Sequence, residues 1–127
     1  MANKAVKTEL APSAIGPYSQ AIKSGDTIYV SGQLGLNPKT GSFDSDDIVT
    51  QTNQSLNNIK AILEFEGYSM NDVVKTTVLL KDINEFSQMN EVYATFFSEP
   101  YPSRAAFEVA ALPKNGRVEI EAIAIKK

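Results

Sequence analysis

Hydrophobic and polar positions follow two different periods along the chain. Short alternating or β-branched runs bounded by Gly, Pro or Asn are typical of strands, and apolar side chains three or four positions apart are typical of helices. Strands are predicted over residues 6–10, 19–24, 27–32, 72–81, 104–112 and 117–125. Helices are predicted over residues 47–66 and from 82 to about 98. No linker, repeat or low-complexity tract interrupts these elements, so residues 1–127 are expected to form a single domain.

Polar residues mark the ends of the predicted helices. Asp46 or Ser45 can cap the first helix, and Gly67 can end it. Asp82, followed three positions later by Glu85, has the signature of a capping box for the second helix. The apolar stripe of the second helix, which we interpret as core, consists of Phe86, Met89, Tyr93, Phe96 and Phe97.

Two dipeptides that contain glycine predict tight turns. Gly25 with Asp26 joins the second and third predicted strands, and Asn115 with Gly116 lies between the last two. Asn-Gly is the strongest short hairpin signal, so the last two strands are predicted to form a hairpin. The order strand, strand, strand, helix, strand, helix, strand, strand indicates an α+β fold, with a mixed sheet of six strands and both helices packed on one face.

The last predicted strand has two different faces. One face carries Val118, Ile120, Ala122 and Ala124. The other carries Glu119, Glu121, Ile123 and Ile125. Large apolar residues on a face that no helix covers indicate that another copy of the chain covers it. In the preceding strand Arg104, Ala106 and Glu108 share one face, and we expect Arg104 and Glu119 to lie near an interface between subunits.

Composition limits the chemistry available to the chain. Its 127 residues contain no cysteine and no histidine, which excludes disulfides, thiolate metal sites, thiol nucleophiles and imidazole bases. A metal site would need carboxylates and carbonyl oxygens alone, and the acidic run of residues 44–47 lacks the spacing of a calcium loop, so no metal is expected.

Charge and hydropathy argue against nucleic-acid and membrane partners. The formal net charge of −3 provides no general basic surface for nucleic acid or an anionic membrane. No segment approaches the roughly 20 apolar residues that span a bilayer, and residues 1–10 lack the apolar core of a signal peptide. A cytoplasmic location is therefore the default expectation.

Four motifs occur in an order that is typical of one protein family. They are GPYSQA at residues 16–21, VSGQ at 30–33, MNEVYATFF at 89–97 and PSRAAFEVAALPKNGRVEIEAIAI at 102–125. On these motifs the chain resembles the Rid family, the reactive intermediate deaminases also called the YjgF family, and its RidA branch in particular. The resemblance implies a chorismate-mutase-like fold and a homotrimer whose sheets line a central barrel, with three sites between subunits.

The resemblance also implies an activity without a cofactor. Family members hydrolyse enamines and imines, typically 2-aminoacrylate or 2-aminocrotonate, to a 2-oxo acid and ammonia. Arg104 matches the arginine that grips the substrate carboxylate, as a planar guanidinium can through two parallel hydrogen bonds. Glu119 matches the carboxylate that positions and activates water. The family places Glu121 outside the site.

The remaining site residues also follow from the resemblance. Tyr18 matches the tyrosine that closes over the substrate, and Gly32 matches a backbone donor to the substrate carboxylate, with Ser31 in support. Asn90 is a further candidate for substrate binding. Ala106 stands where many bacterial members have cysteine. Since other members have alanine there and the expected nucleophile is water, activity is expected to survive, and the main-chain carbonyl of Ala106 can still accept a hydrogen bond.

Spacing alone favours simpler interpretations of the same residues. Arg104 then reads as a surface or salt-bridged arginine, Glu119 as a solvated strand carboxylate and Asn90 as a helix-surface or subunit-contact residue. Two other functions remain as alternatives: an RNA-directed translation inhibitor or endoribonuclease, and a non-catalytic, chaperone-like module that binds small carboxylates. Salt-sensitive RNA affinity would favour the first, and binding without enamine hydrolysis would favour the second.

Overall fold

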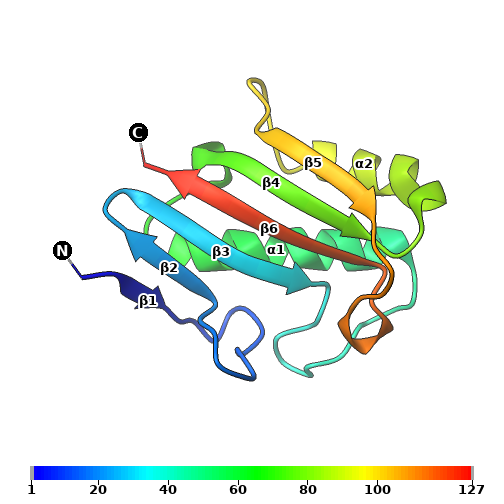
Figure 1. Ribbon diagram of the computed structural model, residues 1–127, viewed down its shortest axis with the longest axis horizontal. Helices are drawn as coiled ribbons and strands as arrows, with labels where there is room; N and C mark the ends of the chain where they lie inside the picture. The colour runs from blue at the N-terminus through cyan, green and yellow to red at the C-terminus, as the bar shows by residue number, and fades with distance from the viewer. Residues whose placement is uncertain (1, 127) are drawn as a thin grey trace.

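A single mixed sheet with two helices on one face forms the body of the molecule (Figure 1). The computed structural model describes residues 2–126. Within them the strands are β1 Lys4–Val6, β2 Ala21–Ser24, β3 Thr27–Leu34, β4 Val73–Leu80, β5 Ser103–Glu108 and β6 Val118–Ile125. The α-helices are α1 Ile48–Phe65 and α2 Phe86–Ala94, and short 3₁₀ turns are η1 Met70–Asp72, η2 Ile83–Glu85 and η3 Pro113–Asn115.

The strand order is β1-β2-β3-β6-β4-β5. β4 and β5 pair in parallel, and the other neighbouring pairs are antiparallel. Both helices lie behind the sheet in Figure 1, so the other face is uncovered within this chain. The predicted six-stranded mixed sheet with two helices on one face is confirmed.

The predicted hairpin between the last two strands is wrong. β6 lies between β3 and β4, whereas β5 is at the edge of the sheet beyond β4. The chain reaches β5 through α2 and therefore pairs it in parallel with β4, so β5 and β6 have no ladder between them. The turn signal identified the local backbone only in part, because Asn115 has a left-handed φ of 58° but Gly116 has a φ of −65°, and the second left-handed residue is Lys114 with a φ of 55°.

The first strand is also misplaced in the prediction, since β1 ends at Val6. Beyond it, the side chain of Gln20 takes the place of a neighbouring strand. Thr8 donates its backbone N–H to Gln20 Oε1 at 2.7 Å, and Gln20 Nε2 donates to the Thr8 carbonyl at 3.0 Å. The alternation of apolar and polar residues that predicted a strand over 6–10 therefore continues beyond the last residue of β1 that pairs with β2.

Both helices start or end differently from the prediction. Asp47, one residue later than expected, caps α1 by accepting a hydrogen bond from the Thr50 N–H at 2.8 Å. Asp82 caps η2 as expected, but the Glu85 carboxylate does not complete the capping box. α2 ends at Ala94 rather than near residue 98.

The core lies between α1 and the sheet. The alternation of β6 is confirmed, because the side chains that its inner face contributes are fully or almost fully buried: Val118, Ile120, Ala122 and Ala124. α1 approaches closely where β3 has ended. A Cβ added to Gly35 would lie 2.6 Å from Gln51 Cα, so only glycine fits there.

Polar side chains of α1 hold the end of β3 in place. Ser55 Oγ donates to the Gln33 carbonyl at 2.6 Å, and Asn58 Nδ2 donates to the carbonyls of Leu34 at 3.2 Å and Leu36 at 3.0 Å. These buried groups are satisfied by carbonyls at and just beyond the end of β3, past Val30, the last residue of β3 that pairs with β2. The end of β3 is thus fixed by α1 on the helix-covered side of the sheet.

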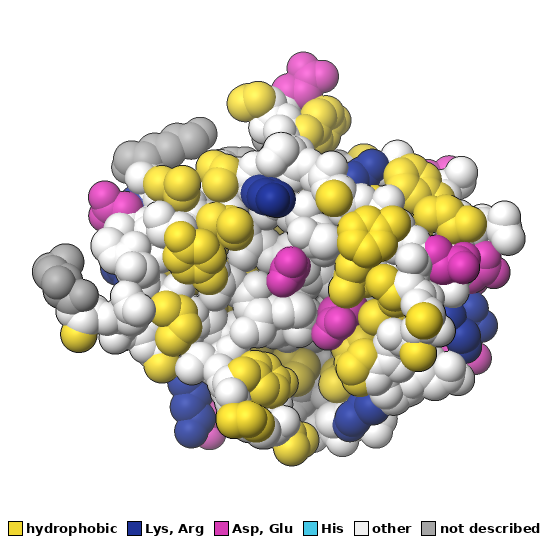
Figure 2. Space-filling view, in the orientation of Figure 1, with side chains coloured by type: hydrophobic (Ala, Val, Ile, Leu, Met, Phe, Trp, Pro, Cys, Tyr) yellow, Lys and Arg dark blue, Asp and Glu magenta, His cyan; other side chains and the backbone are white. Residues whose placement is uncertain are grey.

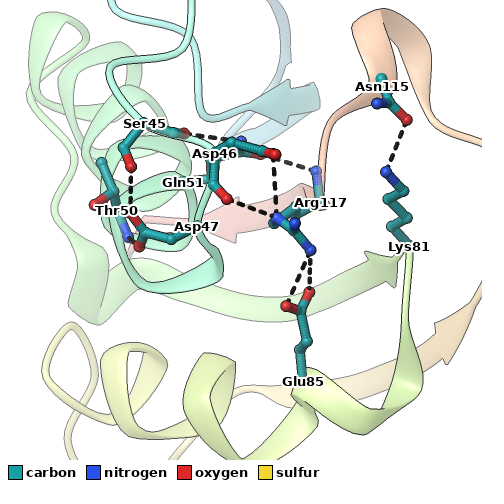
Figure 3. A network of polar contacts seen from close by, with 9 residues as sticks. All are labelled: Ser45, Asp46, Asp47, Thr50, Gln51, Lys81, Glu85, Asn115 and Arg117. Atoms are coloured by element: carbon teal, nitrogen blue, oxygen red, sulfur yellow. Dashed lines mark hydrogen bonds and ion pairs between the residues drawn. The ribbon is translucent and has the colours of Figure 1, made fainter.

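Arg117 connects the start of β6 to the start of α1 and to η2 (Figure 3). Its guanidinium pairs with Glu85 at 3.0 Å and with Asp46 at 3.2 Å, and its backbone N–H donates to Gln51 Oε1 at 2.8 Å. This network explains why Glu85 and Asp46 are absent from the caps predicted for them.

The uncovered face of the sheet is mixed in character. Figure 2 shows acidic side chains near its centre with hydrophobic side chains around them. The exposed apolar residues there include Tyr29, Phe107 and Ile125, which are 43–49% exposed. Neither α1 nor α2 has the length and hydropathy that a bilayer crossing requires, and no other helix among residues 2–126 does.

Candidate functional site

A β-bulge in β3 lies at the centre of the first group of predicted site residues. Val30 pairs with Ala122 and Gln33 with Ile120, so Ser31 and Gly32 together face a single residue of β6, Glu121. A bulge leaves its extra residue outside the regular ladder and bends the strand. The backbone of this segment is therefore presented to the surface, as a backbone donor to a ligand requires.

Glu119 folds over this bulge. A Cβ built on Gly32 would lie 2.9 Å from both Cδ and Oε2 of Glu119, closer than side chains tolerate. Glycine at position 32 therefore allows the carboxylate to lie directly against the main chain. The two residues, predicted from separate motifs, are in contact.

The electrostatics of Glu119 differ from those of an ordinary surface carboxylate. Burial is the main cause that raises the pKa of Glu119 above its usual value of 4.5, and the charge of Glu121 raises the pKa further. A carboxylate with a raised pKa is a better proton acceptor, which is the property a general base needs. The family resemblance places Glu121 outside the site, but Glu121 lines the same cavity as Glu119.

Ser31 supports the loop that carries Tyr18. Its hydroxyl donates to the Ser19 carbonyl at 2.6 Å, and its backbone N–H donates to the Gln20 carbonyl at 2.9 Å. Tyr18 itself is 53% exposed and lies at the same cavity, which has a volume of about 640 Å³. Ile15, Leu34 and Leu36 contribute apolar wall. Tyr18, Ser31, Gly32 and Glu119 are thus brought together in one chain.

Arg104 lies elsewhere, on β5, and its guanidinium packs against α2. Its Nη1 donates to Asn90 Oδ1 at 2.7 Å, and its Cζ lies 4.8 Å from the ring centroid of Tyr93 and 5.3 Å from that of Phe86. Within residues 2–126 no carboxylate pairs with Arg104. An exposed guanidinium seated on aromatic rings, with most of its five N–H donors unused by the described residues, can bind an anion.

Asn90 and Ala106 belong to this second group. Asn90 contacts Arg104 rather than standing as an independent polar residue. Ala106 is half-buried against the core, two residues further along the same face of β5. A separate cavity of about 410 Å³ lies beside Arg104 and Asn90, with Tyr101 and Pro102 in its wall.

The sheet separates the two groups. Arg104 pairs with Thr76 of β4, which in turn pairs with the buried Ala122, so Arg104 lies on the helix-covered side. Glu119 pairs with Leu79, which pairs with Phe107, and these residues lie on the uncovered side. Within one chain the predicted site is therefore divided between the two faces of the sheet. The acidic half contains Glu119, and the basic half contains Arg104.

Sequence reasoning missed the aromatic seat of Arg104. Phe86 and Tyr93 were interpreted as core, and Tyr93 is indeed buried, but both rings also contact the guanidinium. The signal was present in the spacing, because residues 86, 90 and 93 follow one another at intervals of four and three on one face of a helix. The spacing could not show that β5, which carries Arg104, lies beside this face of α2.

Comparisons with known proteins agree over nearly the whole chain. Residues 8–126 match the family described as endoribonuclease L-PSP. The chain is 58% identical over 120 residues to a RutC family protein of Pyrococcus horikoshii, covering 94% of this chain and 95% of that protein. It is 51% identical over 123 residues to the 2-iminobutanoate/2-iminopropanoate deaminase of Mus musculus, covering 97% and 91%.

The fold has the same close match. The crystal structure of RidA from the Antarctic bacterium Psychrobacter superposes with a TM-score of 0.93 at 50% identity, covering 97% of this chain and 99% of that one. The chain therefore belongs to the endoribonuclease L-PSP family, which is the Rid or YjgF family that its sequence resembles.

Proposed function

We propose that this protein is a deaminase that hydrolyses 2-imino acids, and the enamines that tautomerise to them, to 2-oxo acids and ammonia. The observation that carries the proposal is the presence in one chain of a carboxylate with a raised pKa, Glu119, and of a guanidinium free to bind a substrate carboxylate, Arg104. The relatives named 2-iminobutanoate/2-iminopropanoate deaminase support the choice of substrate class.

We further propose that the site forms between two copies of the chain in a homotrimer. Arg104 and Glu119 lie on opposite faces of one sheet, so a substrate of four carbons cannot contact both within one chain. The exposed apolar residues of the uncovered face, including Phe107 and Ile125, support burial against a neighbour. The basic half of one subunit then meets the acidic half of the next.

In the proposed reaction the Arg104 guanidinium and the Gly32 N–H hold the substrate carboxylate. Glu119 accepts a proton from water as the water oxygen forms a bond to C2 and the C=N π electrons move to nitrogen. Glu119 returns this proton to the nitrogen, which gives an intermediate with a hydroxyl and an amino group on C2. The C–N bond then breaks as the hydroxyl oxygen forms the C=O bond, and the hydroxyl proton passes to the nitrogen, which leaves as ammonia. Tyr18 reduces access of bulk solvent. An imine is already electrophilic, so positioning supplies much of the acceleration.

An RNA-directed activity has less support from the residues. The chain has a formal net charge of −3 and no histidine, so it lacks both a basic surface and an imidazole pair for RNA cleavage. The experiment is a coupled assay in which a threonine dehydratase produces the enamine and its absorbance is followed. Added protein should accelerate the decay, and Glu119→Gln should not. Unchanged decay with wild-type protein, together with salt-sensitive RNA binding, would contradict the proposal.

A further inference from the structure

Three side chains from one face of α2 surround the Arg104 guanidinium. The Phe86 and Tyr93 rings lie beneath it, and Asn90 accepts its hydrogen bond. Tyr93 differs from the other two because it is only 5% exposed and its hydroxyl is also bound. Of the three side chains that contact the guanidinium, Tyr93 is therefore the one held inside the protein.

The fixed end of Tyr93 is held by the strand next to Arg104. Thr76 of β4 is the ladder partner of Arg104, is 1% exposed, and its Oγ1 lies 2.8 Å from Tyr93 Oη. On the other side, the Phe97 ring packs against Tyr93 with centroids 4.7 Å apart. The Tyr93 ring thus extends from a buried hydroxyl to an exposed guanidinium and is held by contacts at both ends.

We propose that Tyr93 is a positioning residue, which fixes the Arg104 guanidinium through the buried hydrogen bond to Thr76 and thereby sets the affinity for the substrate carboxylate. The inference rests on the proposed function of Arg104. A long, exposed arginine loses much rotamer freedom when it binds an anion. A seat that has already ordered the side chain lowers this cost, which is the general effect of preorganisation.

The expected kinetic signature is a change in KM without a matching change in kcat. The substrate carboxylate keeps its charge throughout the reaction, so Arg104 binds the ground state and the transition state alike. Loss of such uniform binding raises KM and leaves kcat nearly unchanged. A loss of folded protein would instead lower the apparent kcat.

The test uses two variants of Tyr93 and one of its partner. Tyr93→Phe keeps the ring and removes the hydroxyl, and we expect KM to rise about threefold to fivefold. Thr76→Val removes the same hydrogen bond and should give a similar rise, with no further increase in the double variant. Tyr93→Leu also removes the cation–π contact, so KM should rise about tenfold or more. Unchanged KM in all three would overturn the inference.

A second arm asks whether Tyr93 acts through Arg104. When Tyr93→Phe is added to Arg104→Lys, the guanidinium is already absent, so KM should not rise further. An additional rise of the same size as in the wild-type background would show that Tyr93 acts by another route.

Tyr68 provides a matched structural control. It is also 5% exposed, its hydroxyl donates to the Asp26 carbonyl at 2.8 Å, and Lys23 and Lys126 lie over its ring. Tyr68→Phe should lower stability comparably to Tyr93→Phe and leave KM unchanged. Equal increases in KM for both tyrosine variants would attribute the effect to general destabilisation and overturn the inference.

Binding of the product 2-oxobutanoate, measured by calorimetry, separates this inference from the proposed function. Wild-type protein should bind it, and Tyr93→Phe should weaken binding by the same factor as KM. If wild-type protein binds the product but hydrolyses no enamine, the proposed function fails while weaker binding by Tyr93→Phe still supports the inference. If hydrolysis occurs and Tyr93→Phe binds as wild type does, the inference fails alone.

Discussion

At the scale of single residues, the role proposed for Arg104 depends on the geometry of its guanidinium and not on its charge alone. Arg104→Lys keeps the charge but loses the planar fork and its stacking on Phe86 and Tyr93. We expect kcat/KM for the enamine to fall at least about tenfold, because charge-assisted hydrogen bonds contribute about 1.5–3 kcal/mol each. The fold and assembly should be retained, as checked by circular dichroism and light scattering. A variant as active as wild type would show that the carboxylate binds elsewhere.

Glu119 and Glu121 share a cavity, yet only Glu119 lies against Gly32. Glu119→Gln should therefore slow hydrolysis far more than Glu121→Gln, measured as kcat in the coupled assay. Equal losses would mean that the two carboxylates act interchangeably and that the contact with Gly32 has no functional meaning.

The pH dependence provides an independent check on Glu119. A general base must be ionised, so activity should fall as the pH drops through the pKa of Glu119, which lies above 4.5. Glu121 is the smaller of the two causes that raise this pKa. Glu121→Gln should therefore move the acidic limb of the pH–rate profile to lower pH. A limb that stays in place or moves to higher pH would exclude Glu119 as the titrating group.

Residue types and spacing predicted Glu119, Gly32 and Arg104 only with the help of a family resemblance. Alternation along β6 correctly assigned Glu119 to the face away from the helices. It could not show that Arg104 lies on the other face of the sheet, because that depends on β5 pairing with β4 rather than with β6. The contact between Glu119 and Gly32 depends on a bulge, which no periodicity signals in advance.

At the scale of elements, local chemistry predicted where the elements are better than how they pair. β3, α1 and β4 lie close to their predicted ranges because period and caps are local properties. Asn115 adopts the left-handed backbone that its turn signal favours, whereas Gly116 does not, and the strands on either side of this turn do not pair with each other. Pairing is decided by the crossover through α2, which the turn residues do not encode.

The approach of α1 to the end of β3 gives a prediction about stability. Gly35→Ala places a methyl group against the backbone of Gln51, which cannot move without displacing the helix. We expect the free energy of unfolding to fall by about 1–3 kcal/mol, measured by denaturant titration. Gly41→Asn is the control, because Gly41 has a φ of 72° that asparagine tolerates and no atom within 4 Å of an added Cβ. A loss no larger than the control's would contradict the tight contact.

At the scale of the whole molecule, the uncovered sheet face predicts assembly. Ile125 is 43% exposed on that face, and burial of an isoleucine contributes about 1.5–3 kcal/mol. Wild-type protein should sediment as a homotrimer at micromolar concentration, and Ile125→Asp should weaken both assembly and deaminase activity. Val49→Asp is the control, because Val49 is 46% exposed in the first turn of α1, away from the sheet. A monomer that still hydrolyses the enamine would rule out a site between subunits.

The opposite placement of Arg104 and Glu119 also has a genetic consequence. Arg104→Lys chains lack the clamp and Glu119→Gln chains lack the base, so at substrate concentrations well below KM each variant alone should retain only a small part of wild-type activity. In a mixed trimer of the proposed kind, one junction joins an intact Arg104 to an intact Glu119. Unfolding and refolding the two variants together in equal amounts should therefore restore about a quarter of the wild-type activity, since about three quarters of the trimers are mixed and each has one working site. Two alleles that each impair activity would then complement each other in the same cell, whereas a single chain carrying both substitutions would rescue neither.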